Sequence, residues 1–323
     1  MIFLKKFISS GIITIFSGVF LCGCTTGTHK VPQVSITDEP VTTTAVSTTV
    51  SGEDRLIDVQ EGVFIYDKAS TLTNTEYSEC NEYAKMLYKD YLLNAAVVIT
   101  NDLEGMSTDQ YAAEAYDNIF NGMGSGILFL VNNDTQEDIL YKTGHCQRFI
   151  DNVSERDELY RATKELVVGN YKEAAMIMMK LGEKCPKNVI DNSNIFSEDV
   201  TSELSGSLDV CANKLALIAT NNASGISNDE LARMYCTRRY GEGNGYIAII
   251  DKKTRTVTCV TNGELSPEIT EIVSSANNIA ANNDFIGAAN KLVSGFGGIP
   301  LTISERTTEL SETEDESAGE DDE

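Results

Sequence analysis

Two stretches of this chain repeat the same order of apolar and polar runs. The first extends from Ala95 to Gly144 and the second from Leu215 to Gly263. Each begins with an apolar run and a capped amphipathic segment, and continues with Gly-x-Gly, an aliphatic run and a β-rich run that closes on Gly. Corresponding residues differ by 120 before the Gly-x-Gly and by 119 after it, so one deletion separates the two stretches. Internal similarity at a fixed offset indicates a duplicated unit.

The periodicity of these runs predicts helices and strands in alternating order. Three helix starts have the spacing of a capping box: Thr73-Asn-Thr-Glu76, Ser107-Thr-Asp-Gln110 and Ser227-Asn-Asp-Glu230. The predicted order is a helix from Thr73, a strand to Thr100, a helix over 107–120, strands over 127–131 and 138–143, and helices over 155–168 and 171–181. This alternation predicts an α/β fold in which each repeat is an α/β/α sandwich.

The duplication divides the chain into five parts. We expect a leader over 1–23, a Thr- and Ser-rich tether over 24–61, a first α/β domain over 62–183, a second and divergent one over 188–296, and an acidic tail over 297–323. The two domains are called the first and the second repeat below. The end of the tail, from Glu309 to Glu323, holds nine acidic residues and no basic one, which predicts disorder.

The leader has the pattern of an export signal. Lys5 and Lys6 precede an apolar run from Phe7 to Leu21, and Leu21-Cys-Gly-Cys24 follows. This ending resembles a bacterial lipobox, in which Cys24 is lipidated and becomes the new N-terminus. The alternative is an uncleaved transmembrane anchor, but the apolar run is shorter than the roughly 20 residues that a span needs. We therefore expect a lipoprotein that is anchored at the extracellular face of the cell membrane.

The charge of the chain limits its partners. The net charge is −24, and removal of the leader with its two lysines leaves −26. Such a surface repels phosphate backbones and attracts cations, cationic peptides or positively charged wall components. Nucleic acid is therefore excluded as a partner, whereas an envelope protein is expected.

Several short motifs of the first repeat carry a resemblance to a known family. In chain order they are Asp67-Lys-Ala69 before a capped helix, Val97-Val-Ile-Thr100, Ser107-x-x-Gln110-Tyr-Ala, a Gly before an aliphatic strand, and Thr143-Gly144 after a hairpin. Together they resemble the TPM domain, over about 62–181 and, more weakly, over 191–296. The resemblance implies an α/β/α sandwich, an extracytoplasmic location, membrane attachment and, for some members, acid phosphatase activity or calcium binding.

The chain departs from the family pattern at one loop. Members carry Asp-Asn-Gly before the aliphatic strand, whereas this chain has Gly124-Ser125-Gly126 and Gly243-Asn244-Gly245. Gly124, Gly126, Gly144 and His145 are the residues expected near the family site. If that site uses the missing aspartate, both repeats have lost a ligand.

Other candidate chemistry is sparse. Asp67, Asp102 and Asp134 follow predicted strands and are candidate metal ligands, because open α/β sheets bind ligands at their strand ends. The alternative is that they are solvated carboxylates in turns. The first repeat is expected to hold any calcium site, with a weak affinity of roughly 0.1 to 1 mM. The chain has two histidines, His29 and His145, and the latter adjoins Cys146. Neighbours on an extended chain point to opposite sides, which argues against a nucleophile and base pair.

Six cysteines follow Cys24, and none has metal-binding spacing: Cys80, Cys146, Cys185, Cys211, Cys236 and Cys259. They are interpreted either as small buried apolar residues or as partners in disulfides, which an exported protein permits. Cys185 and Cys211 are the pair selected for a first test.

Two classes of function remain. The first is a binding or accessory module, in which paired domains on a lipid tether meet another envelope protein. The second is a weak acid phosphatase or calcium-binding hydrolase of the TPM type. The missing Asp of Asp-Asn-Gly and the absence of a catalytic motif favour the binding module. No cofactor is expected beyond weakly bound calcium.

Overall fold

The computed structural model describes residues 56–222 and 225–302. The predicted leader, Cys24, His29, most of the tether and the tail from residue 303 lie outside the described residues. Within the described ranges, no helix is both long and apolar enough to cross a membrane.

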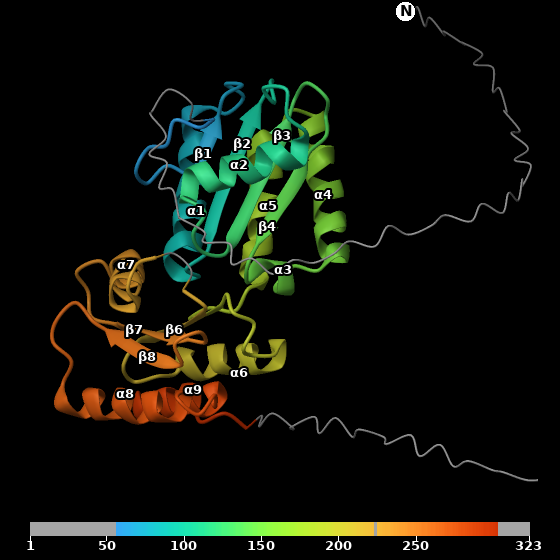
Figure 1. The fold of residues 1–323 in the computed structure, drawn as a ribbon. Coiled ribbons are helices and arrows are strands. Elements are labelled where there is room, and N and C mark those ends of the chain that lie inside the picture. The colour runs from blue at the N-terminus through green and yellow to red at the C-terminus, as the bar shows by residue number, and fades with distance from the viewer. Residues whose placement is uncertain (1–55, 223–224, 303–323) are drawn as a thin grey trace, which may run out of the picture. The chain divides into compact units, whose positions relative to one another are not determined.

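The first repeat forms one four-stranded sheet in the order β1-β2-β3-β4 (Figure 1). The first three strands are parallel and β4 runs antiparallel to β3. The elements are β1 (Ile65–Asp67), α1 (Asn74–Asp90), β2 (Asn94–Thr100), α2 (Thr108–Phe120), β3 (Gly126–Asn132), β4 (Ile139–Thr143), α3 (Cys146–Phe149), α4 (Asn152–Val167), α5 (Tyr171–Lys180) and the 3₁₀ turn η1 (Leu181–Lys184).

The second repeat forms a separate sheet in the order β5-β6-β7-β8. Its first three strands are again parallel and its fourth is antiparallel. The elements are β5 (Val189–Asp191), α6 (Glu198–Asp209), β6 (Leu215–Thr220), α7 (Asn228–Tyr240), β7 (Tyr246–Asp251), β8 (Thr256–Val260), α8 (Pro267–Ala280) and α9 (Phe285–Gly295).

The register of strand pairing is the same in both repeats. Ala95 pairs with Ile127 on the neighbouring strand, and Leu215 pairs with Tyr246. These are the positions that the offsets of 120 and 119 predict, so the repeated sequence forms the same ladder twice. The predicted fold class, two tandem α/β units, is confirmed.

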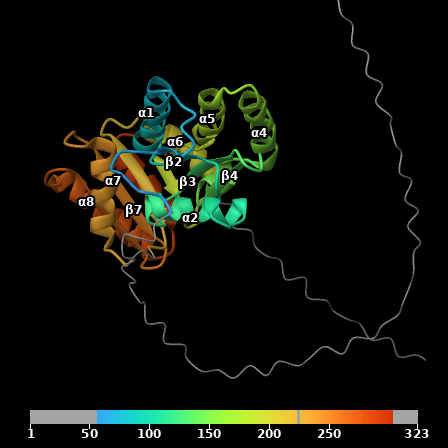
Figure 2. The same ribbon diagram turned by 90° about the horizontal axis from the view of Figure 1, so that it is seen from above.

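Helices cover both faces of each sheet. In the first repeat, α1, α4 and α5 lie on one face and α2 on the other (Figure 2). In the second repeat, α6, α8 and α9 lie on one face and α7 on the other. The paired alanines of α5 and α9 are buried, namely Ala174, Ala175, Ala288 and Ala289. These small side chains let α5 approach α4, and α9 approach α8, closely.

The helix starts agree only in part with the predicted capping boxes. At α1 both bonds form, since Thr73 accepts from the Glu76 N–H and Glu76 accepts from the Thr73 N–H. At α2 and α7 the serine cap bond forms alone. The side chain of Gln110 instead donates to Glu114 one turn later. The helix predicted from residue 155 begins at Asn152, because Asp151 accepts from two N–H groups of its first turn.

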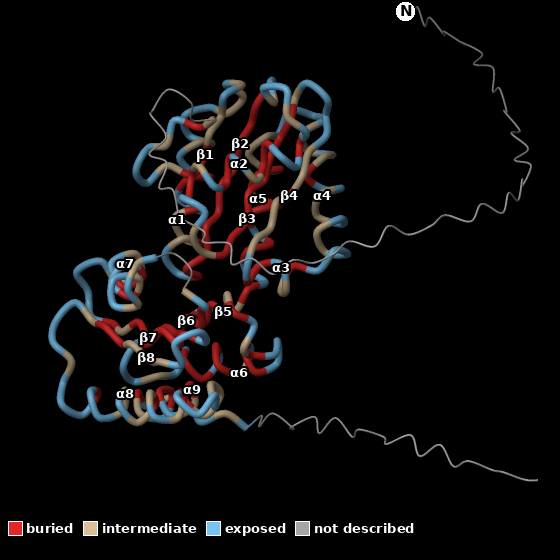
Figure 3. Tube along the Cα trace, in the orientation of Figure 1, coloured by how far each residue is buried: buried red, intermediate tan, exposed pale blue. Residues whose placement is uncertain are grey.

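The core of the first repeat continues into one face of the second sheet. Alternate residues of β6 and β7, including Ala216, Ile218, Ile247 and Ile249, belong to the same buried cluster as β2 and β3. The residues between them face a second cluster under α8 and α9. Figure 3 shows the central strands buried along their length. Because strand side chains alternate between faces, β6 and β7 are apolar on both sides.

Gly126 permits the close approach of β3 to β2. A Cβ at this position would overlap the carbonyl oxygen of Asn94 and stand 2.6 Å from the Asn94 Cβ. Gly206, on the exposed side of α6, has nothing within 4 Å of the same position. The first glycine is therefore required by packing, and the second is not.

We predict that Gly126→Ala lowers the free energy of unfolding by about 3 kcal/mol, since the strands must separate to admit the methyl group. Gly206→Ala, the matched control, is expected to raise it by about 0.5 to 1 kcal/mol, because alanine is the better helix former. Urea unfolding of both variants measures the difference. A Gly126→Ala protein as stable as the wild type would contradict the pairing of Asn94 with Gly126.

Candidate binding site at the junction of the two repeats

The predicted site residues lie at two opposite edges of the first sheet. Asp67 ends β1, and Asp102 and Asp134 follow β2 and β3, so all three lie at the carboxyl edge of the parallel strands. Gly124 and Gly126 precede and begin β3, at the other edge. Gly144 and His145 reach this same edge because β4 is antiparallel. The strand directions therefore separate the aspartates from the glycine loop.

The three aspartates act in local turns. Asp67 accepts from the N–H groups of Thr71 and Leu72 at 2.7 Å each. Asp102 accepts from the Glu104 N–H at 2.7 Å. The Asp134 N–H donates to Asn132 Oδ1. Among the described residues, no group of three or more His, Cys, Asp or Glu side chains is arranged to hold a metal ion. These aspartates are thus not gathered into a ligand set, and calcium binding stays a prediction.

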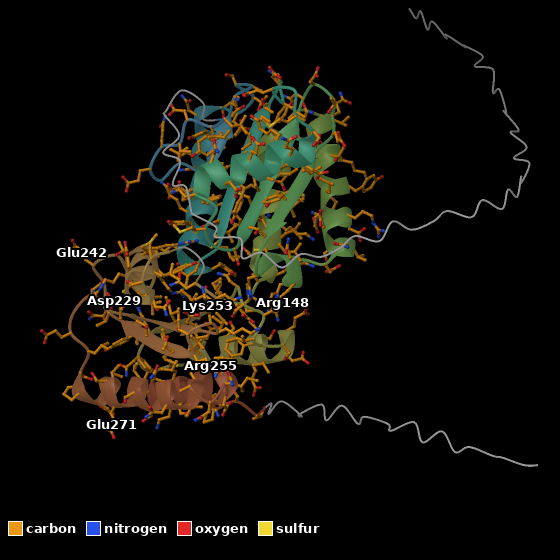
Figure 4. The ribbon with its side chains drawn as sticks, viewed as in Figure 1. Arg148, Asp229, Glu242, Lys253, Arg255 and Glu271 are labelled. Atoms are coloured by element: carbon orange, nitrogen blue, oxygen red, sulfur yellow. The ribbon has the colours of Figure 1, made fainter. Side chains whose placement is uncertain are left out.

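Asp191 repeats the role of Asp67 in the second repeat. It accepts from the N–H groups of Ile195 and Phe196, four and five residues later, as Asp67 does from Thr71 and Leu72. Asp191 is fully buried, and Arg148 of α3, which Figure 4 labels, donates to it at 2.9 Å. Arg148 also donates to the Phe196 carbonyl. One arginine of the first repeat therefore fastens the loop after β5.

His145 is buried at the same junction. Its Nδ1 accepts from the Asp191 N–H at 3.3 Å, so Nε2 carries the proton and has no partner among the described residues. Burial lowers the pKa of His145 to about 4, although the Asp191 carboxylate opposes the shift. The imidazole is therefore neutral at physiological pH. It fills the junction and gives the predicted loop a structural contact with the second repeat.

Cys146 does not pair with His145. Its thiol lies 3.5 Å from the Cys185 thiol, and burial raises the pKa of Cys146 well above its ordinary value. Cys185 and Cys211, the pair selected for a first test, are not bonded: Cys211 follows α6 and its thiol contacts the carbonyl oxygens of Ser207 and Val293. All six cysteines of the described residues are free thiols.

A cavity of about 870 Å³ lies beside the glycine loop. The first repeat lines it with the segment before β1, with α1, with Asn94 and with residues 119–124. The second repeat contributes β6 and α7, including Tyr235 and Arg238. Its volume falls within the roughly 300 to 1,000 Å³ typical of small-molecule sites. The cavity is therefore the candidate binding site.

Arg238 is the charged group that distinguishes this cavity. Its Nε donates to the Tyr88 carbonyl at 2.5 Å and its Nη1 to Asn94 Oδ1 at 3.1 Å. The guanidinium lies over the Tyr88 ring, 3.5 Å from the centroid. Nη2 is buried and has no hydrogen-bond partner within the described ranges. Burial lowers the pKa of Arg238 to about 10, so the side chain is still a cation at neutral pH.

The sequence pattern did not reveal these residues. Asn94 begins β2 in a position that reads as the edge of an apolar run. Tyr235 and Arg238 lie on α7, which carries several charged residues. Nothing in the sequence distinguishes Arg238 from the other arginines of this helix as a buried cavity residue. The single indication in the sequence was Gly124, in the loop expected near the family site. In the structure its φ is 82°, and an added Cβ would lie 3.1 Å from Asn94 Nδ2.

The first repeat matches the model of a known protein family. The model of the TPM domain matches residues 65–181, from β1 through α5. The chain is also similar to the solution NMR structure of the N-terminal domain of a protein from P. gingivalis, with 12% identity and a TM-score of 0.35. That similarity covers 38% of this chain and 82% of the other. No curated protein matches the sequence.

We predict that His145 makes the protein less stable in acid. The unfolded chain binds a proton to this residue below about pH 6.5, whereas the native state binds it only near pH 4. The contribution of neutral His145 to the free energy of unfolding is thus fully present above pH 6.5. It falls by up to about 3 kcal/mol as the pH approaches 4.

His145→Asn is the comparison variant, because its side-chain oxygen can still accept from the Asp191 N–H without titrating. Urea unfolding of both proteins between pH 4 and 7.5 separates this effect from the shared titration of carboxylates. The difference in unfolding free energy between them should shrink as the pH falls. Parallel pH profiles would show that His145 is not the neutral buried group described above.

Proposed function

Because this chain contains a TPM domain at residues 65–181, we propose that the protein is a binding or accessory module of the cell envelope. The leader and its Leu21-Cys-Gly-Cys24 ending support a lipid anchor on Cys24 at the extracellular face. The tether then places the folded repeats above the membrane. A second protein of the envelope is the proposed partner.

An exposed apolar row on α4 is the observation that carries this proposal. Val153, Tyr160 and Val167 are 57%, 63% and 81% exposed, and they are spaced seven residues apart. Seven residues are close to two helical turns, so the three side chains lie on one side of α4. Val168, directly after the helix, is 68% exposed. Exposed apolar side chains that gather on one side of a helix are a feature of protein interaction sites.

The position of the row supports docking of a partner. α4 packs on α5 through its opposite side, where Ala162 is fully buried. Three of the seven large apolar side chains that are exposed in the described part of the chain belong to this row, and a fourth, Val168, directly follows it. Scattered exposed residues are ordinary, but their concentration on one helix is not.

We predict that the triple variant Val153→Ser, Tyr160→Ser, Val167→Ser loses its envelope partner. A photo-crosslinking group at residue 157, beside the row, should capture one dominant membrane protein from native cells. The triple substitution should reduce the yield at least tenfold, because the partner would lose most of the apolar area it covers. Mass spectrometry of the crosslinked product gives both the yield and the identity.

Val210→Ser together with Ile299→Ser is the matched control, since these residues are 55% and 61% exposed but lie outside α4. This control should retain the crosslink. An equal yield from the triple variant and the control would refute docking through α4. Circular dichroism melting of each protein confirms that the substitutions leave the fold intact.

Acid phosphatase or calcium-binding hydrolase activity is the second candidate, and the match to the TPM domain favours it. We expect no release of phosphate from phosphomonoesters between pH 5 and 7, with or without calcium, because Gly124 stands where the family has aspartate. Release that requires calcium and is lost in Asp67→Ala would favour the hydrolase instead. The fold of this variant must be verified, since Asp67 also orders the turn before α1.

A further inference from the structure

The cavity beside Gly124 contains a cation without a counterion. Within the described ranges Arg238 forms no ion pair, and its guanidinium lies over the rings of Tyr88 and Tyr235. A desolvated guanidinium costs free energy unless an anion or sufficient hydrogen bonds compensate it. Arg239, the next residue on α7, is different. Its donors reach the carbonyl oxygens of Lys89 and Asp90 and the side chain of Asn188.

The surrounding groups hold the guanidinium in one orientation. The Tyr88 ring lies against its face, and Nε and Nη1 each have an acceptor. Asn94, which accepts from Nη1, is itself fixed because its Nδ2 donates to the Tyr116 hydroxyl at 3.0 Å and to the Met123 carbonyl at 2.6 Å. Nη2 is buried, and its two N–H groups have no acceptor in the described part of the chain. A group that is preorganised in this way binds a ligand with little loss of entropy.

Tyr235 supplies a second donor to the same cavity. The side chain is 8% exposed, and its hydroxyl makes no hydrogen bond with any described residue. Its oxygen lies 3.4 Å from the position that a Cβ on Gly124 would occupy. The absence of a side chain at Gly124 therefore keeps the space in front of the hydroxyl open.

The rest of the cavity wall is polar and apolar in similar measure. Its apolar side chains come from both repeats and include Phe64, Ile119, Phe120, Ile218, Leu231 and Met234. A ligand that fills this space needs an apolar body as well as an anionic end. Free inorganic anions would leave most of the wall without contacts.

We propose that this cavity binds a carboxylic acid with an apolar body, whose carboxylate accepts from Arg238 Nη2 and the Tyr235 hydroxyl. One guanidinium balances one negative charge, and a carboxylate oxygen can accept a charge-assisted hydrogen bond from Nη2. A phosphate dianion would bring a second charge, which the cavity does not neutralise. The other cation in the wall, Lys85, is paired with Glu82 at 2.7 Å, and Glu61 adds a negative charge.

Isothermal titration calorimetry of the full chain tests the proposal with a graded series of ligands. Acetate, hexanoate, phenylacetate and 4-phenylbutyrate share the carboxylate and differ in apolar bulk. Affinity should rise along the series, and phenylacetamide, which lacks the charge, should bind at least tenfold more weakly than phenylacetate. Equal affinity for the acid and the amide would overturn the role of Arg238. Absence of binding by every acid at 10 mM would overturn the proposal as a whole.

Substitutions locate the site. Arg238→Gln should weaken the tightest acid at least tenfold, and Tyr235→Phe should weaken it several-fold while keeping the ring in place. Arg239→Gln is the matched control, since it removes an arginine from the same helix without touching the cavity, and it should bind as the wild type does. If Arg238→Gln fails to fold, the affinity of Tyr235→Phe for the tightest acid shows whether the acid binds in this cavity. Tighter binding of phenyl phosphate than of phenylacetate would overturn the assignment to carboxylates.

Discussion

The packing of α7 between the second sheet and α1 is the contact on which the rest of the structure depends. It covers the face of β6 and β7 that carries Ala216, Ile218, Ile247 and Ile249, and it joins these residues to the core of the first repeat. Removal of this apolar area from water stabilises the junction. The polar groups trapped there must then find partners inside the protein, because water no longer reaches them. The Asp191 carboxylate pairs with Arg148, and His145 accepts a hydrogen bond from the Asp191 N–H.

The two repeats use one local motif in two environments. Asp67 and Asp191 each accept from the backbone four and five residues later, and each thereby shapes the turn before a helix. In the first repeat this turn remains accessible to solvent. In the second, the carboxylate is fully buried under Arg148. The two repeats thus share a turn, and at the junction one of these turns has a further role in holding the repeats together.

The sequence predicted the fold well and the site poorly. The alternation of strands with helices and the repetition of the unit were accessible because each depends on periodicity and on residues close in the chain, as the offsets of 120 and 119 show. Asp67, Asp102 and Asp134 were expected to meet, but short turn bonds occupy two of these carboxylates and leave no ligand set in the described residues. The glycine loop was placed correctly in the chain, yet the sequence did not show that it borders the second repeat.

The sequence by itself determined the elements of this protein and their order along the chain, because hydrophobic period and caps act over a few residues. The tertiary structure alone decided which surfaces meet. Arg238 and Asn94 are 144 residues apart, and Arg148 and Asp191 are 43 apart. Whether an arginine is solvated or buried with one unpaired nitrogen depends on the groups that pack around it, and no local pattern encodes that environment. The cavity exists because two sheets share one core around such groups.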